Sequence, residues 1–140
     1  MLFRSVTDRR YIALVSGEIE KKEGTVRSWL TEDKRFVIHS SPVDNGGQYA
    51  VTHYRVLESN GQYSLVELML ETGRKNQIRV HMADLGYPVV GDHKYGSEDD
   101  SIRRLGLHAY MLCFRHPVTG KFLRFETPVP ESFERRLNAK

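Results

Sequence analysis

The sequence predicts an α+β domain with a mixed, mainly antiparallel sheet and a few short helices. Two observations lead to this fold class. Segments 48–58 and 62–71 alternate in polarity on either side of the turn signal SNG at 59–61, which is typical of a β-hairpin. The other predicted strands are also joined locally, so we expect hairpins rather than βαβ units.

The strands before this hairpin follow from short apolar segments. Apolar residues occupy both faces of RRYIALVSG at 9–17, which predicts a central strand ending at Gly17. GTVRSWL at 24–30 is predicted as a short strand. The segment 31–47 is mostly polar around a short FVIH and ends in the loop signal DNGG.

After the hairpin, the apolar period changes from that of a strand to that of a helix. Ile78, Met82 and Leu85 fall at i, i+4 and i+7, which predicts a helix over about residues 75–85. Gly86 follows it as a typical residue beyond a helix C-terminus.

The last third of the chain is predicted as two strands and a helix. LHAYMLCF at 107–114 and KFLRFE at 121–126 are joined by the turn-rich RHPVTG, and PESFERRL at 130–137 forms a terminal helix. A chain of 140 residues has the usual size of one domain, so we treat residues 1–140 as one unit.

Composition favours a protein outside the membrane. No run approaches the roughly 20 apolar residues that a membrane span requires, and the N-terminus lacks the apolar stretch of a signal peptide. The one cysteine, Cys113, lies among apolar residues and is expected to be a buried free thiol. The cytoplasm is therefore the expected compartment.

The basic residues are clustered, although the formal net charge is only +3 and the pI is near 9.1. The clusters are Arg4, Arg9 and Arg10; Arg74, Lys75 and Arg79; and Arg103 and Arg104. On one face they would attract a polyanion, whereas spread over the surface they would only maintain solubility. The sequence leaves both arrangements open.

The densest cationic segment is ETGRKNQIRVHMADLG at 71–86. Lys75 and Arg79 are like charges at i and i+4, and they lie near a helix N-terminus that already carries positive partial charge. This favours an anion from outside the helix, either a phosphate or a carboxylate of the same protein, over a merely solvated face.

Motifs for several other kinds of chemistry are missing from the sequence. It contains no phosphate-binding G-x-x-x-x-G-K-[ST], no G-x-G-x-x-G and no G-x-S-x-G. No Cys/His cluster has metal-ligand spacing. We therefore expect neither a metal nor a nucleotide cofactor.

Three segments in order resemble sequence blocks of the RluA family of pseudouridine synthases. LETGRKNQIRVHMADLGYPVVGDHKYG at 70–96 resembles the block T-G-R-x-H-Q-[IL]-R-V-H followed by G-x-P-[IL]-x-G-D-x-x-Y-G. RRYIALVSG at 9–17 is similar to K-x-Y-x-A-x-V-x-G. LGLHAYMLCFRHPVTGKFLRFETPVPESF at 105–133 resembles the family's C-terminal block.

This resemblance implies an enzyme that isomerises uridine to pseudouridine in ribosomal or transfer RNA without cofactor or metal. Tyr11 matches the tyrosine that packs against the flipped uridine, although a tyrosine on an apolar strand is also a common core residue. Arg79 matches the arginine that forms an ion pair with the catalytic aspartate, and Ile78 matches the aliphatic residue of the base pocket. The resemblance also places three residues near the RNA backbone, namely Arg74, Lys75 and His81.

The sequence departs from the family pattern at two points. Asn76 replaces the usual His, and the H-R-L-D block that carries the nucleophilic aspartate is not found in these 140 residues. We therefore expect residues 1–140 to be the C-terminal part of a catalytic domain, inactive alone, with a carboxylate partner for Arg79 that the chain does not itself contain. A non-catalytic RNA-binding module is the alternative. We also expect a homodimer or swapped assembly to cover an exposed sheet edge.

Overall fold

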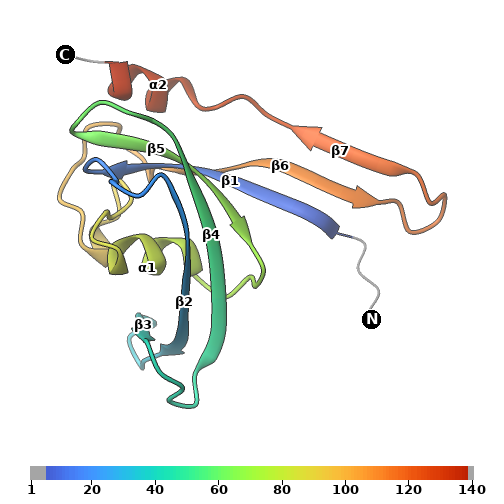
Figure 1. Cartoon of the computed structure of the whole chain (residues 1–140), viewed down its shortest axis with the longest axis horizontal. Coiled ribbons are helices and arrows are strands. Elements are labelled where there is room, and N and C mark those ends of the chain that lie inside the picture. The colour runs from blue at the N-terminus through green and yellow to red at the C-terminus, as the bar shows by residue number, and fades with distance from the viewer. Residues whose placement is uncertain (1–5, 139–140) are drawn as a thin grey trace.

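A computed structural model describes residues 6–138, which form one antiparallel sheet with two α-helices (Figure 1). The strands follow the order β3-β2-β4-β5-β1-β6-β7. Their bounds are β1 (Val6–Ser16), β2 (Glu23–Glu32), β3 (Ile38–Ser41), β4 (Gln48–Ser59), β5 (Tyr63–Leu70), β6 (Leu107–Arg115) and β7 (Phe122–Glu126). The helices are α1 (Gln77–Asp84), the 3₁₀-helix η1 (His93–Tyr95) and α2 (Glu131–Asn138).

The predicted α+β class is confirmed, and the sheet is more uniform than expected. The strand pairs named for residues 6–138 are all antiparallel, so within this range the sheet is not mixed. The predicted hairpin is β4–β5. The FVIH segment, expected inside a loop region, supplies the short strand β3, which pairs with the end of β2.

Strand β1 is central, as its apolar pattern predicts. It lies between β5 and β6, and each residue from Ile12 to Val15 is at most 1% exposed. Alternate residues of a strand point to opposite faces. Ala13 and Val15 therefore pack toward α1, whereas Ile12 and Leu14 pack toward α2.

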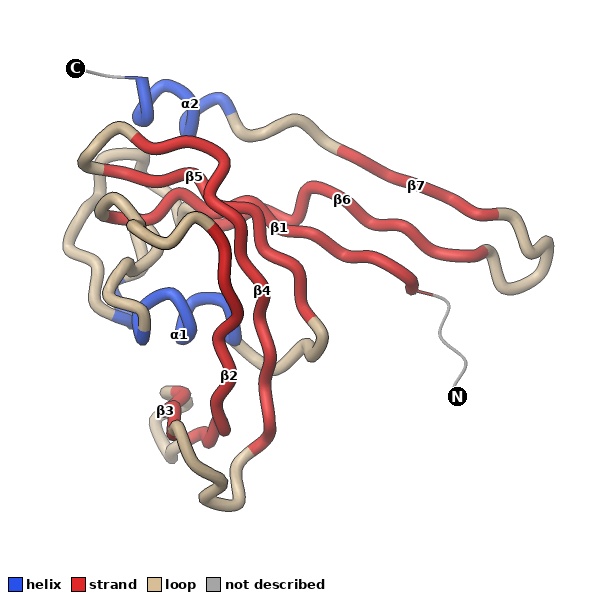
Figure 2. Tube along the Cα trace, in the orientation of Figure 1, coloured by secondary structure: helices blue, strands red, loops and turns tan. Residues whose placement is uncertain are grey.

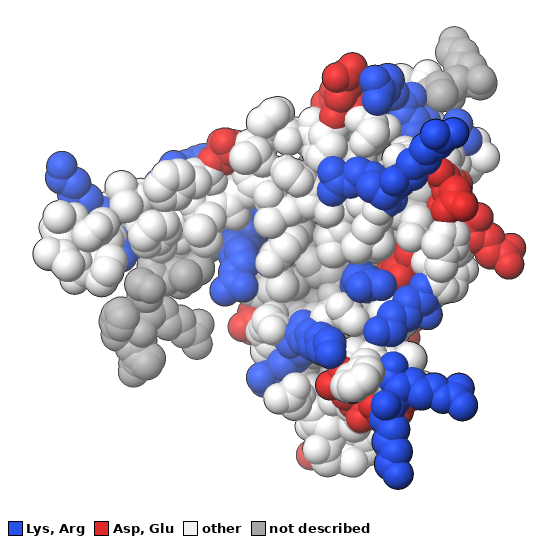
Figure 3. Space-filling model, turned by 180° about the vertical axis from the view of Figure 1, so that it is seen from behind, with Lys and Arg blue, Asp and Glu red and all other residues white. Residues whose placement is uncertain are grey.

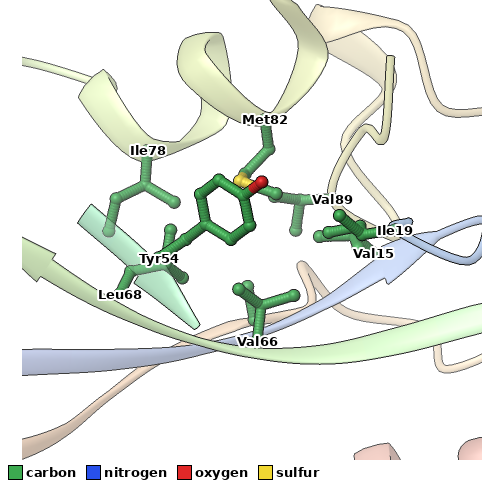
Figure 4. Close-up of a cluster of buried hydrophobic side chains, with 9 residues drawn as sticks. Val15, Ile19, Tyr54, Val66, Leu68, Ile78, Met82 and Val89 are labelled. Atoms are coloured by element: carbon green, nitrogen blue, oxygen red, sulfur yellow. The ribbon is translucent and has the colours of Figure 1, made fainter. Parts of the chain in front are cut away.

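The α1 face carries the larger core cluster (Figure 4). Ile78 and Met82 of α1 pack against β-strand residues that include Tyr54 and Leu68. Burial of each such side chain stabilises the fold by about 1.5–3 kcal/mol. The other predicted member of the helical stripe, Leu85, is 36% exposed, because α1 ends one residue before it.

The helix α1 starts two residues later than its pattern predicts. Asn76 adopts a left-handed conformation with φ 56°, so helical geometry begins only at Gln77. Its end agrees with prediction, because Gly86 has φ 93°, a conformation that glycine adopts at little cost. No helix within residues 6–138 is both long and apolar enough to cross a membrane.

The β6–β7 arm, which we define as residues 107–126, projects away from the rest of the sheet (Figure 2). Phe125 is 57% exposed and stacks on Phe114 with 5.8 Å between ring centroids, and Phe122 is 56% exposed. The outer side of β7 pairs with no other strand of the described chain. The arm thus has an unpaired strand edge and exposed apolar side chains. Cys113 is buried within it, as expected.

Candidate active site beside α1

Tyr11 and Ile78, the two residues predicted to contact a base, belong to one cluster. Tyr11 is half-buried on β1 and packs against the core that contains Ile78, and it lies opposite Leu68 in the β1–β5 register. The Tyr11 hydroxyl makes no hydrogen bond to another residue of the range 6–138. Tyr11 therefore packs against the core and remains partly exposed.

Arg9 lies on the same side of β1 as Tyr11, because the two are separated by one residue. It is exposed, and its Nη1 atom lies 3.7 Å from the position of a Cβ added to Gly73. The described residues include no ion-pair or hydrogen-bond partner for its side chain. The sequence pattern did not single out Arg9 as a site residue, although its i, i+2 spacing from Tyr11 was a usable signal.

The turn between β5 and α1 is held by the buried side chain of Gln77. Its Oε1 accepts hydrogen bonds from Thr72 Oγ1 at 2.7 Å and from the Arg74 backbone N–H at 3.0 Å. Its Nε2 donates to Thr52 Oγ1 at 2.8 Å and to a β4 carbonyl at 3.0 Å. The turn that carries Arg74 is thus fixed to β4.

Arg74 projects from this turn and remains partly exposed. Its Nε donates to the carbonyl of Tyr49 at 3.0 Å, which orients the guanidinium. The turn therefore supplies an oriented cation, and Arg9 lies over Gly73, the residue that precedes Arg74. Arg9 and Arg74 therefore both lie at the β5–α1 turn.

Arg79 is paired within the chain, which corrects a central expectation. Its Nε and Nη2 atoms lie 3.0 and 2.9 Å from the two carboxylate oxygens of Asp92, and its Nη1 donates to Asn76 Oδ1 at 3.3 Å. The Tyr95 ring lies 5.1 Å from the Arg79 guanidinium carbon. The hydrogen bonds with Asp92 raise the pKa of Arg79. The carboxylate expected from outside is therefore a buried aspartate of the same protein, the alternative that the local charges left open.

The two remaining residues expected near RNA lie in different environments. Lys75 is exposed, forms an ion pair with Glu32 at 2.6 Å and stays on the surface. His81 is fully buried, with its ring nitrogens 2.9 Å from Ser28 Oγ and 2.7 Å from Thr52 Oγ1. Burial lowers the pKa of His81. The expectation that His81 faces RNA is wrong, because it lies on the inner side of α1.

Basic side chains are spread over one face of the molecule (Figure 3). Seen from behind, Lys and Arg side chains flank a largely uncharged central surface (Figure 3). A partly exposed aromatic ring, and guanidiniums that have no carboxylate partner in the described part of the chain, suit an unstacked base attached to phosphates. Among residues 6–138, no group of three or more His, Cys, Asp or Glu side chains is placed so that it could bind a metal ion.

Comparisons with known proteins agree with this arrangement. A family model described as RNA pseudouridylate synthase matches residues 2–84. The chain is 43% identical over 131 residues to the uncharacterized RNA pseudouridine synthase YlyB of Bacillus subtilis, covering 93% of this chain and 43% of that protein. It is 40% identical over 152 residues to ribosomal large subunit pseudouridine synthase D of Haemophilus influenzae, covering 97% and 45%.

Solved structures with this fold include two human proteins. RNA Pseudouridylate Synthase Domain Containing 1 aligns with a TM-score of 0.76 and 29% identity, covering 89% of this chain and 55% of that one. RNA Pseudouridylate Synthase Domain Containing 4 aligns with a TM-score of 0.73 and 25% identity, covering 93% and 60%. The chain spans less than half the length of the curated relatives named above.

Proposed function

The chain belongs to the RNA pseudouridylate synthase family, and from this premise we propose that it binds RNA and provides part of the catalytic domain of an enzyme that isomerises uridine to pseudouridine. The observation that carries the proposal is the partly exposed Tyr11, which packs on the Ile78 cluster and shares its face of β1 with Arg9, beside the turn that carries Arg74. Names of relatives favour ribosomal RNA as the substrate class, with transfer RNA as the alternative.

The arrangement suits a base that has been removed from its stack. Unstacking costs a few kcal/mol, and stacking on an aromatic side chain returns about 1–3 kcal/mol per base. In this proposal Tyr11 contacts the base, and Ile78, which is only 4% exposed, supports the Tyr11 ring from the core. Arg9 and Arg74 bind flanking phosphates, because both present guanidinium nitrogens without a carboxylate partner in the described chain. Lys75 adds a further surface charge.

Arg79 takes a different role from the one its sequence block implies. Two of its five N–H donors bond the buried carboxylate of Asp92 and a third bonds Asn76, so its charge is already paired within the chain. We therefore assign Arg79 as a positioning residue that braces α1 against η1. At the β5–α1 turn, Arg9 and Arg74 are the cations that could bind an incoming carboxylate or phosphate in this proposal, because neither has a carboxylate partner among the described residues.

The nucleophile is the part that these 140 residues do not supply. They contain no H-R-L-D sequence, so we propose that the chain alone binds RNA without turning it over. A non-catalytic RNA-binding module remains the second candidate, and it is favoured equally by Arg9 and Arg74, which have no carboxylate partner among the described residues.

One experiment separates these functions. Tritium release from RNA labelled at C5 of uridine reports isomerisation, and fluorescence anisotropy of the same RNA reports binding. We expect binding that weakens steeply with salt and no tritium release by the isolated chain. A Tyr11→Ala variant should weaken binding about tenfold, in line with the loss of one stacked base. Absence of RNA binding by the wild-type chain would refute the proposal, and tritium release would refute the assignment of an external nucleophile.

We also propose that the chain self-associates through the β6–β7 arm. An unpaired strand edge together with exposed phenylalanines favours pairing with another chain. We propose a second copy of this chain as the partner. Two β7 edges related by a twofold axis would form antiparallel backbone hydrogen bonds with each other.

A further inference from the structure

A second cationic surface lies on the α2 side of the molecule, away from Tyr11. A depression of about 350 Å³ is lined by three arginines, two serines and an isoleucine, and no acidic residue lines it. These residues, which we call the α2 pocket, are Ser101, Ile102, Arg103, Ser132, Arg135 and Arg136. An adjoining depression shares Ser101 and Arg103 and adds Arg104, together with His93 and the carboxylate of Asp100. In Figure 3, basic side chains extend over the upper part of the view, where α2 lies.

Arg136 is held rigidly at the edge of this pocket. Its guanidinium carbon lies 5.0 Å from the centroid of the Tyr63 ring, and its Nε donates to the Tyr63 hydroxyl at 3.0 Å. That hydroxyl donates in turn to Asp99 at 2.5 Å. A guanidinium held in this way loses little side-chain entropy when it binds a ligand.

The other two arginines carry charge that the protein compensates weakly or not at all. Arg103 has no hydrogen-bond or ion-pair partner for its side chain within residues 6–138. Arg135 pairs with Glu131 at 3.3 Å, but the two side chains are 70% and 80% exposed. Such exposed pairs are weak, so an incoming anion can compete for Arg135.

The backbone at Arg103 also carries strain. Its φ is 55°, a left-handed conformation that costs a residue other than glycine on the order of 1 kcal/mol. The turn is held by a hydrogen bond from the Arg103 backbone N–H to the carbonyl of Asp100 at 2.9 Å. A strained, exposed and unpaired arginine beside two serine hydroxyls is a suitable donor set for a tetrahedral anion.

We propose that the α2 pocket binds a phosphate of the RNA backbone at a distance from the base-binding surface. The pocket lies on the α2 side of the sheet, and the segment 86–106 joins this side to α1. RNA that contacts both sites would follow this segment around the end of β1. The inference rests on the proposed RNA binding and adds a second point of contact, which fixes the orientation of the RNA without reading its sequence.

The test compares two double variants that remove equal charge. Arg103→Gln with Arg135→Gln removes two of the three arginine charges of the α2 pocket. The control is Arg27→Gln with Arg35→Gln, because both arginines are exposed and lie outside the α2 pocket and the β6–β7 arm. Anisotropy of a labelled RNA stem-loop is measured from 50 to 300 mM KCl. For the pocket variant we expect about tenfold weaker binding and a decrease of about 1–2 in the slope of log K against log salt. The control should change less than twofold, and circular dichroism confirms that both variants are folded.

The outcomes distinguish this inference from the proposed function. If wild-type protein binds RNA and the pocket variant matches the control, the α2 pocket is not an RNA site, while the proposed function stands. If wild-type protein does not bind RNA, both proposals fail. A second arm titrates inorganic phosphate while NMR follows the amides of Ser101 and Ser132. Millimolar or tighter phosphate binding without any effect of the pocket variant on RNA would identify a site for a small phosphorylated ligand and overturn the RNA assignment.

Discussion

Arg79 and Asp92 meet through two parallel hydrogen bonds, Nε to Oδ2 at 3.0 Å and Nη2 to Oδ1 at 2.9 Å. The pair joins the middle of α1 to the residue that precedes η1. Tyr95, at the end of η1, accepts hydrogen bonds through its hydroxyl from the backbone of Ile38 and from Asn76. These contacts link α1, η1 and β3 to one another. The ion pair therefore fixes the position of α1, the helix that carries Ile78.

The first prediction concerns this ion pair. Asp92 is fully buried and Arg79 is 23% exposed, so Asp92→Ala leaves a partly buried charge without its counter-ion. We expect a loss of about 3 kcal/mol in the free energy of unfolding, measured by urea denaturation. The control is Glu131→Ala, which removes the carboxylate of an exposed pair with Arg135 and should cost less than about 1 kcal/mol. Equal losses would show that the buried pair does not brace the fold.

The second prediction concerns pH. Burial lowers the pKa of His81 in the folded protein below the value of about 6.5 expected for the unfolded chain. Between these two values only the unfolded chain binds the proton, so acidification favours unfolding. The contribution is absent above about pH 7 and reduces stability by up to about 1.4 kcal/mol per pH unit below pH 6.5. His81→Asn should flatten this part of the stability profile measured by urea denaturation.

The control for the pH prediction is His93, which has the opposite sign. It is exposed, and the hydrogen bond with Asp100 raises the pKa of His93. It therefore binds its proton more readily in the folded state, and its contribution is present at low pH and lost as the pH rises. His93→Asn should leave the acid-side decrease intact or make it slightly steeper. A flattened profile in this variant as well would show that His81 is not the group responsible.

The third prediction concerns the turn that holds Arg74. Gln77→Leu keeps the side-chain volume and leaves Thr72 and the Arg74 backbone N–H without their acceptor. We expect a loss of about 2 kcal/mol in the free energy of unfolding, together with weaker RNA binding, because Arg74 is no longer oriented. Gln62→Leu, on an exposed turn, should stay within about 0.5 kcal/mol of the wild type. Unchanged RNA affinity in a folded Gln77→Leu protein would contradict the positioning role.

Local patterns were enough to predict most of the fold. The alternation on either side of SNG located the β4–β5 hairpin, and the two apolar faces of RRYIALVSG placed β1 at the centre of the sheet. Both are properties of neighbouring residues, because strand periodicity and turn chemistry act over a few positions. The start of α1 was misplaced by two residues, because the left-handed conformation of Asn76 is set by its contacts rather than by the helical pattern.

Long-range pairing accounts for what the sequence did not predict about the site. The charge pattern showed that Arg79 needed an anion, but the partner lies thirteen residues away on an irregular segment. His81 is buried because Ser28 and Thr52, from β2 and β4, satisfy both ring nitrogens. No local period encodes such partners. The shared face of Arg9 and Tyr11 could have been predicted, because it follows from strand alternation alone, but Arg9 was not predicted as a site residue.

The fourth prediction tests the segment that carries Arg104. Gly91 has φ 82°, and an added Cβ would lie 2.2 Å from the carbonyl oxygen of Arg104. Gly91→Ala therefore combines backbone strain with a clash against main chain, and we expect a loss of at least about 2 kcal/mol on thermal or urea unfolding. Gly61 is a matched control, because it has φ 88° with open space around it, and Gly61→Ala should cost about 1 kcal/mol. Similar losses for both would mean that segment 91–104 adjusts freely.

The fifth prediction concerns self-association through the β6–β7 arm. Phe122 and Phe125 are more than half exposed, and they lie on the strand whose outer edge is unpaired among the described residues. Burial of these rings in an interface would contribute about 1.5–3 kcal/mol each, enough to favour a dimer at micromolar concentrations once backbone pairing is added. Sedimentation velocity should therefore show a concentration-dependent dimer for the wild type.

Two double variants test whether the arm is the interface. Phe122→Ser with Phe125→Ser should yield a monomer at concentrations where the wild type is dimeric, because the exposed apolar surface is removed while the edge strand remains. Val43→Ser with Leu57→Ser removes two other exposed apolar side chains outside the arm and should leave the dimer intact. A wild-type protein that stays monomeric up to about 100 μM would contradict an interface of this strength, since a Kd of 1 μM corresponds to about 8 kcal/mol. A dimer that survives the phenylalanine substitutions would move the interface to another surface.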